Sequence, residues 1–143
     1  MDLIYLNIPQ PVARGRVCSY IASKLLRNPS LVYLIKNTDN IVVSGSKNNF
    51  EEELKTKRNR GSRRWGPFYP RLEDDQIRRC LRGMVSWTTK KGKEAYKRFF
   101  TKGEPYKIKE ILLKQKIVVR RVLSEEFNTR VLSKYSPSIY VEK

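Results

Sequence analysis

Residues 2–35 read DLIYLNIPQPVARGRVCSYIASKLLRNPSLVYLI, and this stretch decides the fold class. The apolar side chains at positions 3–6 and 8 predict a buried strand, which two prolines end. Residues 15–26 then place apolar side chains at helical spacing, and an Asn-Pro pair ends that segment. Residues 31–35 are apolar throughout, as in a strand that is covered on both faces of a parallel sheet. Strand, helix and strand together predict a βαβ unit.

The remaining chain adds weaker helix and strand patterns to this unit. They predict a short strand at 41–43, a helix with the apolar stripe Ile77, Cys80, Leu81 and Met84, a short helix that pairs Ala95 with Phe99, a helix at 107–116 and a strand at 117–123. Ser124 is a plausible cap for a terminal helix, so residues 124–143 are expected to form a C-terminal helix and tail. The order of elements predicts a small α/β sandwich in one domain, residues 1–143.

Charge sets the expected partner. The 143 residues hold 31 Lys and Arg against 14 Asp and Glu, and no histidine, which gives a formal net charge of +17. A small domain this positive repels itself unless counter-charge is supplied, and phosphate is the commonest supply. The missing histidine removes the usual general base and zinc ligand. Nucleic acid is therefore the expected partner, and we expect no enzyme, no cofactor or metal and no small-molecule substrate.

The two cysteines and the apolar runs bear on location. Cys18 and Cys80 have no metal-binding spacing, so both are expected to be reduced core residues. No signal peptide is readable at the amino terminus, and no apolar run is long enough to cross a bilayer. We expect a soluble, intracellular protein with no membrane partner.

Residues 54–72 contain no acidic side chain and predict a basic aromatic loop. Arginines alternate there with Gly, Pro, Trp, Phe and Tyr, without any periodicity. Such a loop suits contact with nucleic-acid phosphates and stacking on an exposed base. A disordered, solvated loop is the alternative. The candidate residues in this segment are Arg58, Arg60, Arg63, Arg64 and Arg71.

Two further basic stretches follow. Arg78, Arg79 and Arg82 project from the face opposite the apolar stripe, and the next turn and helix add lysines. A basic helix face is often only a solvated surface, so this alternative also stays open. The acidic residues 73–75 match the dipole of the helix start, and a two-metal site on them is the alternative. The candidate residues here are Arg78, Arg82, Lys90, Lys91, Lys93 and Lys97.

Four motifs in order resemble family thirteen of the large-subunit ribosomal proteins, in its archaeal and eukaryotic branch. They are the opening helix from Gly15 to Leu26, the short strand and turn from Asn40 to Gly45, the Arg-Gly-Pro aromatic loop from Arg64 to Arg71, and Arg82-Gly83-Met84 with Thr89-Lys90-Lys91-Gly92. The resemblance covers residues 3–105. The chain departs from the family pattern at Trp65, Tyr69, Val85, Ser86 and Thr88.

This resemblance implies a three-layer α/β/α sandwich on a small, mainly parallel four-stranded sheet. It also implies a non-catalytic structural constituent of the large ribosomal subunit that binds rRNA, with neighbouring ribosomal proteins as further partners. The location implied is the cytoplasmic ribosome, with assembly in the nucleolus if the source is eukaryotic. An off-ribosome RNA-processing or RNA-chaperone factor is the alternative. By this match the rRNA contacts are Arg16, Arg64, Arg71, Arg82, Lys90 and Lys91, whereas Arg58, Arg60, Arg63, Arg78, Lys93 and Lys97 rest on charge alone.

Overall fold

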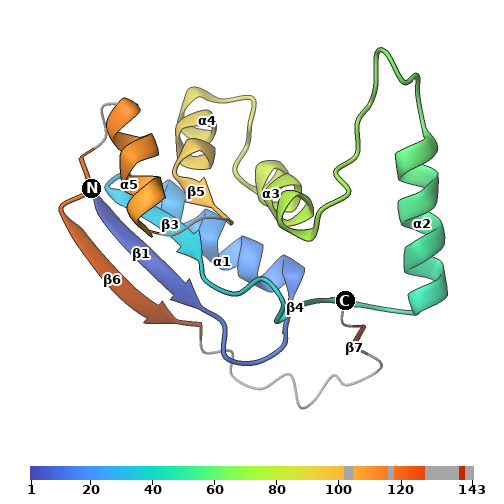
Figure 1. Cartoon of the computed structure of the whole chain (residues 1–143), viewed down its shortest axis with the longest axis horizontal. Helices are drawn as coiled ribbons and strands as arrows, with labels where there is room; N and C mark the ends of the chain where they lie inside the picture. The colour runs from blue at the N-terminus through green and yellow to red at the C-terminus, as the bar shows by residue number, and fades with distance from the viewer. Residues whose placement is uncertain (102–104, 116–117, 128–138, 141–143) are drawn as a thin grey trace.

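The computed structural model of the chain describes residues 1–101, 105–115, 118–127 and 139–140. Figure 1 shows the elements around a twisted sheet. In chain order they are β1 (Asp2–Asn7), β2 (Val12–Ala13), α1 (Arg14–Arg27), β3 (Leu31–Ile35), β4 (Ile41–Ser44), α2 (Lys47–Asn59), α3 (Glu73–Met84), α4 (Lys90–Lys97), β5 (Phe99–Phe100), α5 (Pro105–Lys114), β6 (Arg121–Glu126) and β7 (Ile139–Tyr140).

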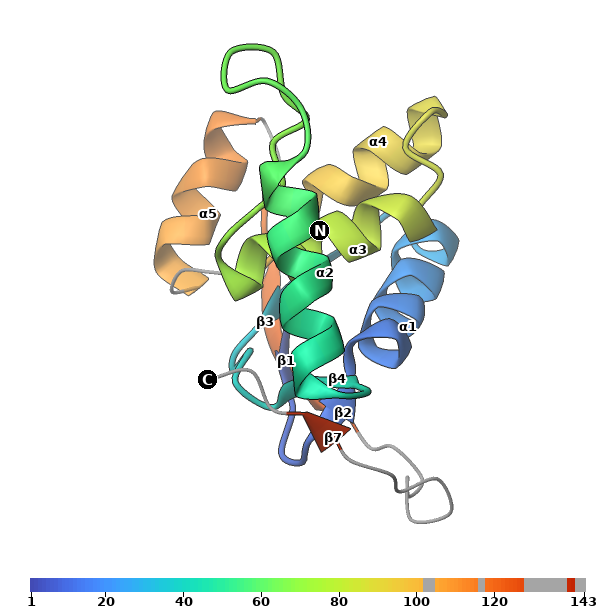
Figure 2. The ribbon, with the colours of Figure 1, turned by 90° about the vertical axis from the view of Figure 1, so that its right-hand side faces the viewer.

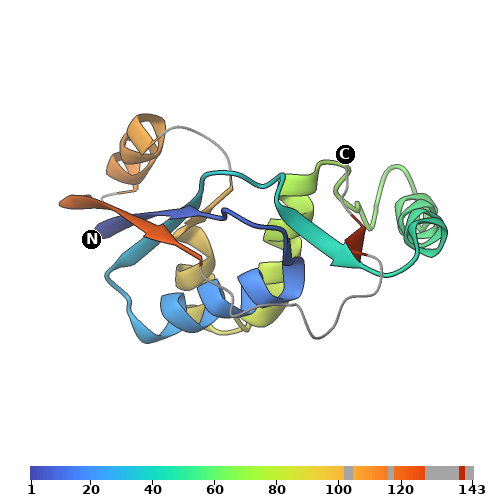
Figure 3. The same cartoon turned by 90° about the horizontal axis from the view of Figure 1, so that it is seen from below.

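The main sheet is parallel and has the strand order β5-β3-β1-β6. The predicted βαβ unit forms its centre, where β1 pairs with β3 and Ile4 lies opposite Tyr33. Helix α5 covers one face, and helices α1, α3 and α4 lie on the other (Figure 3). This arrangement confirms the expected three-layer α/β/α architecture on a small parallel sheet.

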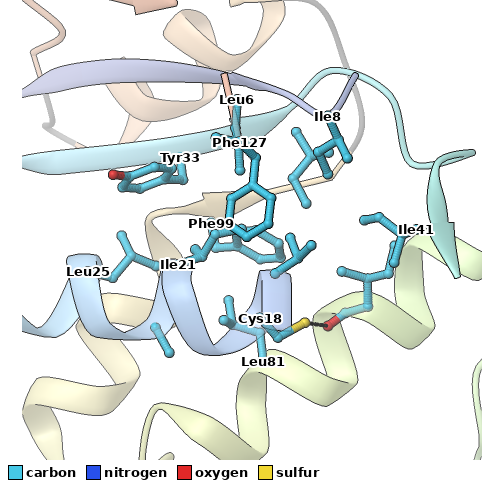
Figure 4. Close-up of a cluster of buried hydrophobic side chains, with 14 of the residues drawn as sticks. Leu6, Ile8, Cys18, Ile21, Leu25, Tyr33, Ile41, Leu81, Phe99 and Phe127 are labelled. Carbon is cyan, nitrogen blue, oxygen red and sulfur yellow. Dashed lines mark hydrogen bonds between the residues drawn. The ribbon is translucent and has the colours of Figure 1, made fainter. Parts of the chain in front are cut away.

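Alternate side chains of the central strands enter two separate cores, because successive residues of a strand point to opposite faces. Ile4 and Leu6 of β1 join the larger core with the apolar side of α1, including Ile21 and Leu25 (Figure 4). Leu3 faces the other way. It packs in the smaller core with Val32, Leu34, Ile108 and Leu112. The uniformly apolar β3 is thus explained by a sheet that is covered on both sides.

A second, small sheet has the order β2-β4-β7, and it leads into α2. This helix stands away from the main sheet (Figure 1). Figure 2 shows the chain turning at the far end of α2 before it returns to α3. The predicted loop at 54–72 therefore begins too early, because residues 54–59 belong to α2. Lys-Glu pairs four residues apart, Lys47 with Glu51 and Lys57 with Glu53, support the helix there.

The predicted helix around residues 95–100 is also wrong in its second half. Helix α4 ends at Lys97, and Phe99–Phe100 is the edge strand β5. Arg98 lies between them, and its carbonyl accepts a hydrogen bond from the Tyr33 amide at 2.9 Å. Phe99 is completely buried in the larger core. Pairing with β3 therefore outweighs the helical spacing of the aromatic residues.

Ser124 does not cap a helix, so the expectation of a C-terminal helix and tail at 124–143 is wrong at its start. Residues 124–126 continue β6, which pairs in parallel with β1 from Asp2 to Asn7. All six residues of β1 offer backbone partners to β6. For this reason β6 continues past residue 123, where the apolar pattern that predicted the strand ends. Residues 128–138 and 141–143 of the expected helix and tail lie outside the described residues.

Glu125 has a structural role that its position in sequence does not reveal. Its carboxylate accepts a hydrogen bond from the Tyr20 hydroxyl and another, at 3.4 Å, from the Tyr33 hydroxyl. Burial, followed by this hydrogen bond, raises the pKa of Tyr20 to about 12, and burial also raises the pKa of Tyr33. Unfolded tyrosine ionises near pH 10, so the stability from both hydroxyls is present below about pH 10 and is lost as the pH rises through the folded pKa values.

We expect Glu125→Ala to lower the free energy of unfolding by about 1–3 kcal/mol, because two half-buried hydroxyls lose their acceptor. Urea denaturation at neutral pH measures the loss. Glu126→Ala is the matched control, since this neighbouring side chain is exposed and we expect a change of only a few tenths of a kcal/mol, as for other surface substitutions. Equal effects of the two substitutions would contradict the assigned role of Glu125.

Both cysteines are free, as expected, but only Cys18 is a fully buried core residue. Cys80 is half-buried at the margin of the larger core. Met84, the last residue of the predicted apolar stripe, is exposed, and Val85 takes the buried position instead.

In the part of the chain that the structure describes, no helix combines the length and the apolar content needed to span a membrane.

Candidate nucleic-acid interface

Three arginines on one side of α3 form the centre of the basic surface. We call Arg78, Arg79 and Arg82 the arginine face. Their positions follow from the opposite side of the helix, where Ile77 and Leu81 are buried in the larger core. The acidic residues 73–75 occupy the first turn of α3, as predicted from the helix dipole.

Each arginine of this face stacks on an aromatic ring from another element. Arg78 lies 5.2 Å from the centroid of Tyr96, Arg82 lies 4.8 Å from Trp87, and Arg79 lies 5.0 Å from Tyr69. Trp87 and Tyr96 themselves meet edge to face at 4.9 Å. Stacking restrains a guanidinium while leaving its edge donors free for a planar anion such as phosphate. The arginine face is therefore preorganised for phosphate.

Helix α4 carries the lysine candidates and packs closely against the end of α3. A side chain at Gly92 would meet the carbonyl oxygens of Val85 and Ser86 at 2.1 and 2.2 Å, so only glycine fits there. The Thr89 hydroxyl caps α4 by accepting a hydrogen bond from the Gly92 amide at 3.1 Å. The exposed lysines of α4 are Lys90, Lys91, Lys93 and Lys97.

A tight turn presents two arginines and a tryptophan at the far end of α2. Ser62 and Gly66 exchange backbone hydrogen bonds of 3.3 and 2.9 Å, which leaves Arg63, Arg64 and Trp65 at the tip. All three are exposed, and Trp65 reaches 83% exposure. A large aromatic side chain in this position has a free face for stacking on a base.

Neighbouring hollows connect the arginine face to α1, to α2 and to the loop that follows α2. Arg79 lines three of them. One hollow of about 220 Å³ also contacts Arg78, and another of about 520 Å³ contacts Arg82 and Trp87. The third has a volume of about 420 Å³ and is bordered by four basic residues, Arg14, Lys57, Arg60 and Arg79. We call this third space the basic hollow.

The structure brings only some of the predicted contacts together. Arg78 and Arg82 share the arginine face, and Arg60 joins it through the basic hollow. Arg58 lies in the last turn of α2 and is joined to Arg71, because its guanidinium donates to the Arg71 carbonyl at 3.4 Å. The remaining candidates are exposed on other elements: Arg16 on α1, Arg63 and Arg64 at the loop tip, and Lys90, Lys91, Lys93 and Lys97 on α4.

Several residues of this surface were not among the sequence candidates. Arg79 is flanked by two candidate residues on α3, and a helical-wheel argument includes it on the same face. Lys57 lies within the basic segment 54–72 but was not chosen as a candidate. Arg14 had no signal in the sequence, because only the folded chain brings the start of α1 and the end of α2 to one hollow. Lys57 also pairs with Glu53, and that contact lowers the pKa of the Glu53 carboxyl.

A thiol borders the basic hollow. Interaction with the neighbouring Cys18 thiol, followed by the charge of Arg14, lowers the pKa of Cys80, although burial acts in the opposite direction. The pKa of Cys18 is raised by the same interaction and by burial, and its thiol donates a hydrogen bond to the Ile77 carbonyl at 3.7 Å. Cys80 is therefore the more readily ionised thiol of the pair.

The acidic clusters do not converge on a metal site in the resolved structure. Among residues 1–101, 105–115, 118–127 and 139–140, no group of three or more His, Cys, Asp or Glu side chains could hold a metal ion.

Comparison with known proteins identifies the family. None of the protein-family models matches the chain. The chain is 42% identical over 84 residues to the large ribosomal subunit protein uL13 of Methanopyrus kandleri, which covers 59% of the chain and 52% of that relative. It is 37% identical over 84 residues to uL13 of Archaeoglobus fulgidus, covering 59% of the chain and 53% of that relative. It is 34% identical over 96 residues to uL13 of Picrophilus torridus, covering 67% of each chain. The chain belongs to the uL13 family.

This result confirms the resemblance seen in the four sequence motifs. It also sets the extent of the match, because the chain spans about half the length of the first two uL13 relatives. The relatives are archaeal, which agrees with the branch that the motifs indicated.

Proposed function

We propose that this protein is a structural constituent of the large ribosomal subunit and binds rRNA through distributed arginine and lysine contacts to phosphate. The observation that carries the proposal is the arginine face, where three guanidinium groups are held by aromatic rings around neighbouring hollows that share Arg79 and Arg82. Arginine recognises phosphate with two parallel hydrogen bonds, and such a surface suits the backbone of folded RNA.

The distribution of charge also supports a structural role. Basic side chains are exposed on α1, on α3, on α4 and at the loop tip, so several sides of one small domain can contact RNA at once. Proteins that read a short sequence instead concentrate their contacts in one groove. Contacts spread in this way hold neighbouring RNA segments in register, which is a structural rather than a catalytic function.

The proposed partners are large-subunit rRNA and neighbouring ribosomal proteins, and the proposed location is the ribosome in the cytoplasm. The name of the relatives, large ribosomal subunit protein uL13, supports the ribosomal part of this proposal. The acidic residues 73–75 have a sufficient role at the start of α3, where they match the helix dipole.

Sedimentation of a cell lysate tests the proposal. We expect the protein to sediment with large subunits in equal stoichiometry and to move to the light fractions after ribonuclease treatment. A protein found only in the light fractions, or bound to RNA precursors but absent from mature subunits, would contradict the structural role and favour the off-ribosome RNA-processing or RNA-chaperone factor.

A further inference from the structure

The basic hollow has features that phosphate contact alone does not explain. Its volume of about 420 Å³ falls within the range of roughly 300–1,000 Å³ that is typical of small-ligand pockets. A flat phosphate-binding surface needs no such depth. The hollow lies where the start of α1, the end of α2, the loop after it and the middle of α3 meet.

The walls of the hollow combine positive charge with an aromatic ring. Tyr69 lines it, with the Lys57 ammonium 5.6 Å and the Arg79 guanidinium 5.0 Å from the ring centroid. Unstacked bases bind to proteins by stacking on aromatic rings or on guanidinium planes. Arg14 and Arg60 supply further charge for a phosphate group.

A buried amide completes the set of groups. Gln76 is only 3% exposed and lines the same hollow, and its side-chain oxygen accepts a hydrogen bond from the Arg14 guanidinium at 3.5 Å. An amide can both donate to and accept from the edge of a base. Arg14 is also the first residue of α1, so the positive end of that helix dipole lies beside the hollow.

We infer that the basic hollow binds a single nucleotide, with the base beside Gln76 and on the Arg79 guanidinium plane that Tyr69 supports, and with the phosphate among the remaining basic side chains. This inference rests on the proposed function and adds to it a pocket for one unstacked nucleotide. The nucleotide is supplied either by a looped-out position of an RNA or by the free nucleotide pool, since the recognised chemistry is the same.

Cys80 provides a built-in reporter for this pocket. The Cys80 thiol lines the hollow and is partly exposed, and its lowered pKa favours reaction as the thiolate, whereas Cys18 is completely buried. A nucleotide in the hollow covers the thiol and also brings a negative charge that disfavours the thiolate. Both effects slow alkylation of Cys80.

The experiment measures the rate of iodoacetamide alkylation of Cys80 in the full chain at neutral pH. The additions are a nucleoside monophosphate, inorganic phosphate, or a single-stranded RNA oligonucleotide. At a nucleotide concentration about ten times the dissociation constant we expect the rate to fall about tenfold, because only unoccupied protein reacts. We expect the oligonucleotide to protect in the same way and inorganic phosphate to protect less. In Cys80→Ser the fast-reacting thiol should be absent, which assigns the signal.

Two substitutions of aromatic residues in the same loop separate the pocket from general RNA binding. Tyr69→Leu should abolish protection, whereas Trp65→Leu, at the exposed loop tip outside the hollow, should preserve protection by the mononucleotide. Protection by the mononucleotide alone indicates a free nucleotide as the source, and protection by RNA alone indicates a nucleotide within RNA.

Unchanged alkylation with both ligands would overturn the inference, as would equal protection by inorganic phosphate or full protection in Tyr69→Leu. RNA binding is followed in the same samples by gel shift. RNA that binds without protecting Cys80 overturns the pocket but not the proposed function, while a failure to bind RNA at all counts against the proposed function itself.

Discussion

We expect Arg98→Met to lower the free energy of unfolding by about 3 kcal/mol or more. Arg98 is only 6% exposed, and burial lowers the pKa of its guanidinium. The guanidinium donates to the carbonyl of Leu25 at 3.0 Å, of Asn28 at 3.0 Å, of Leu31 at 2.9 Å and of Glu94 at 3.3 Å. Methionine fills a similar space but donates nothing, so buried carbonyls lose charged donors, and each such loss costs about 1–3 kcal/mol. Urea denaturation followed by circular dichroism measures the change.

The neighbouring residue is the matched control. Lys97 is exposed in the last turn of α4, and Lys97→Met removes the same charge from the same helix end. We expect a loss of only a few tenths of a kcal/mol, from a weaker interaction with the helix dipole. If Arg98→Met were no more destabilising than Lys97→Met, Arg98 would not hold the end of α1 to β3 and α4.

Arg98 illustrates where inference from a basic sequence stops. Arg98 directly follows the candidate Lys97 in the sequence, and composition alone would assign both side chains to phosphate. In the fold, the helix ends at Lys97, and Arg98 turns inward to satisfy carbonyls at the end of α1. Phosphate contact and the satisfaction of buried carbonyls both use the N–H donors of the guanidinium. The residues around an arginine in the sequence therefore do not show whether its acceptor is a phosphate or a buried backbone oxygen.

The central fold could be predicted because its signals are local. The strand, helix and strand of residues 2–35 each have a distinct apolar pattern, and all three form as expected. The errors occur where pairing partners decide the structure. Phe99 and Phe100 form a strand because β3 is beside them, and residues 124–126 remain extended because β1 continues to offer backbone partners. Such partners lie far away in the sequence.

The basic surface could be predicted in kind but not in arrangement. Composition and helical spacing placed Arg78, Arg79 and Arg82 on one helix face, although only Arg78 and Arg82 were chosen as candidate contacts. The aromatic partners of these arginines come from three other segments, at Tyr69, Trp87 and Tyr96. The basic hollow depends on the meeting of α1, α2 and α3 in space, and no spacing along the chain encodes that meeting.

Reversal of two charges on the arginine face should give the largest loss of RNA affinity. Arg79 and Arg82 are exposed; Arg79 lines all three neighbouring hollows, and Arg82 lines two of them. In Arg79→Glu with Arg82→Glu, two attractions to phosphate become repulsions, and we expect binding to a large-subunit rRNA fragment to weaken by about 3 kcal/mol or more. The slope of log K against log salt should fall by about one for each lost phosphate contact. Filter binding at several salt concentrations measures both quantities.

The control must carry the same change in net charge. Arg120 and Arg121 are exposed at the edge of the main sheet, on β6 and the residue before it, so Arg120→Glu with Arg121→Glu matches the charge change on another side of the molecule. A general field effect lowers affinity equally in both variants, whereas direct contact lowers the salt slope mainly in the α3 variant. Unchanged thermal unfolding shows that the α3 variant is folded, because both side chains point away from the core. An identical salt slope in the wild-type protein and the α3 variant would remove the arginine face from the RNA interface, and large subunits that incorporate the variant normally would do the same.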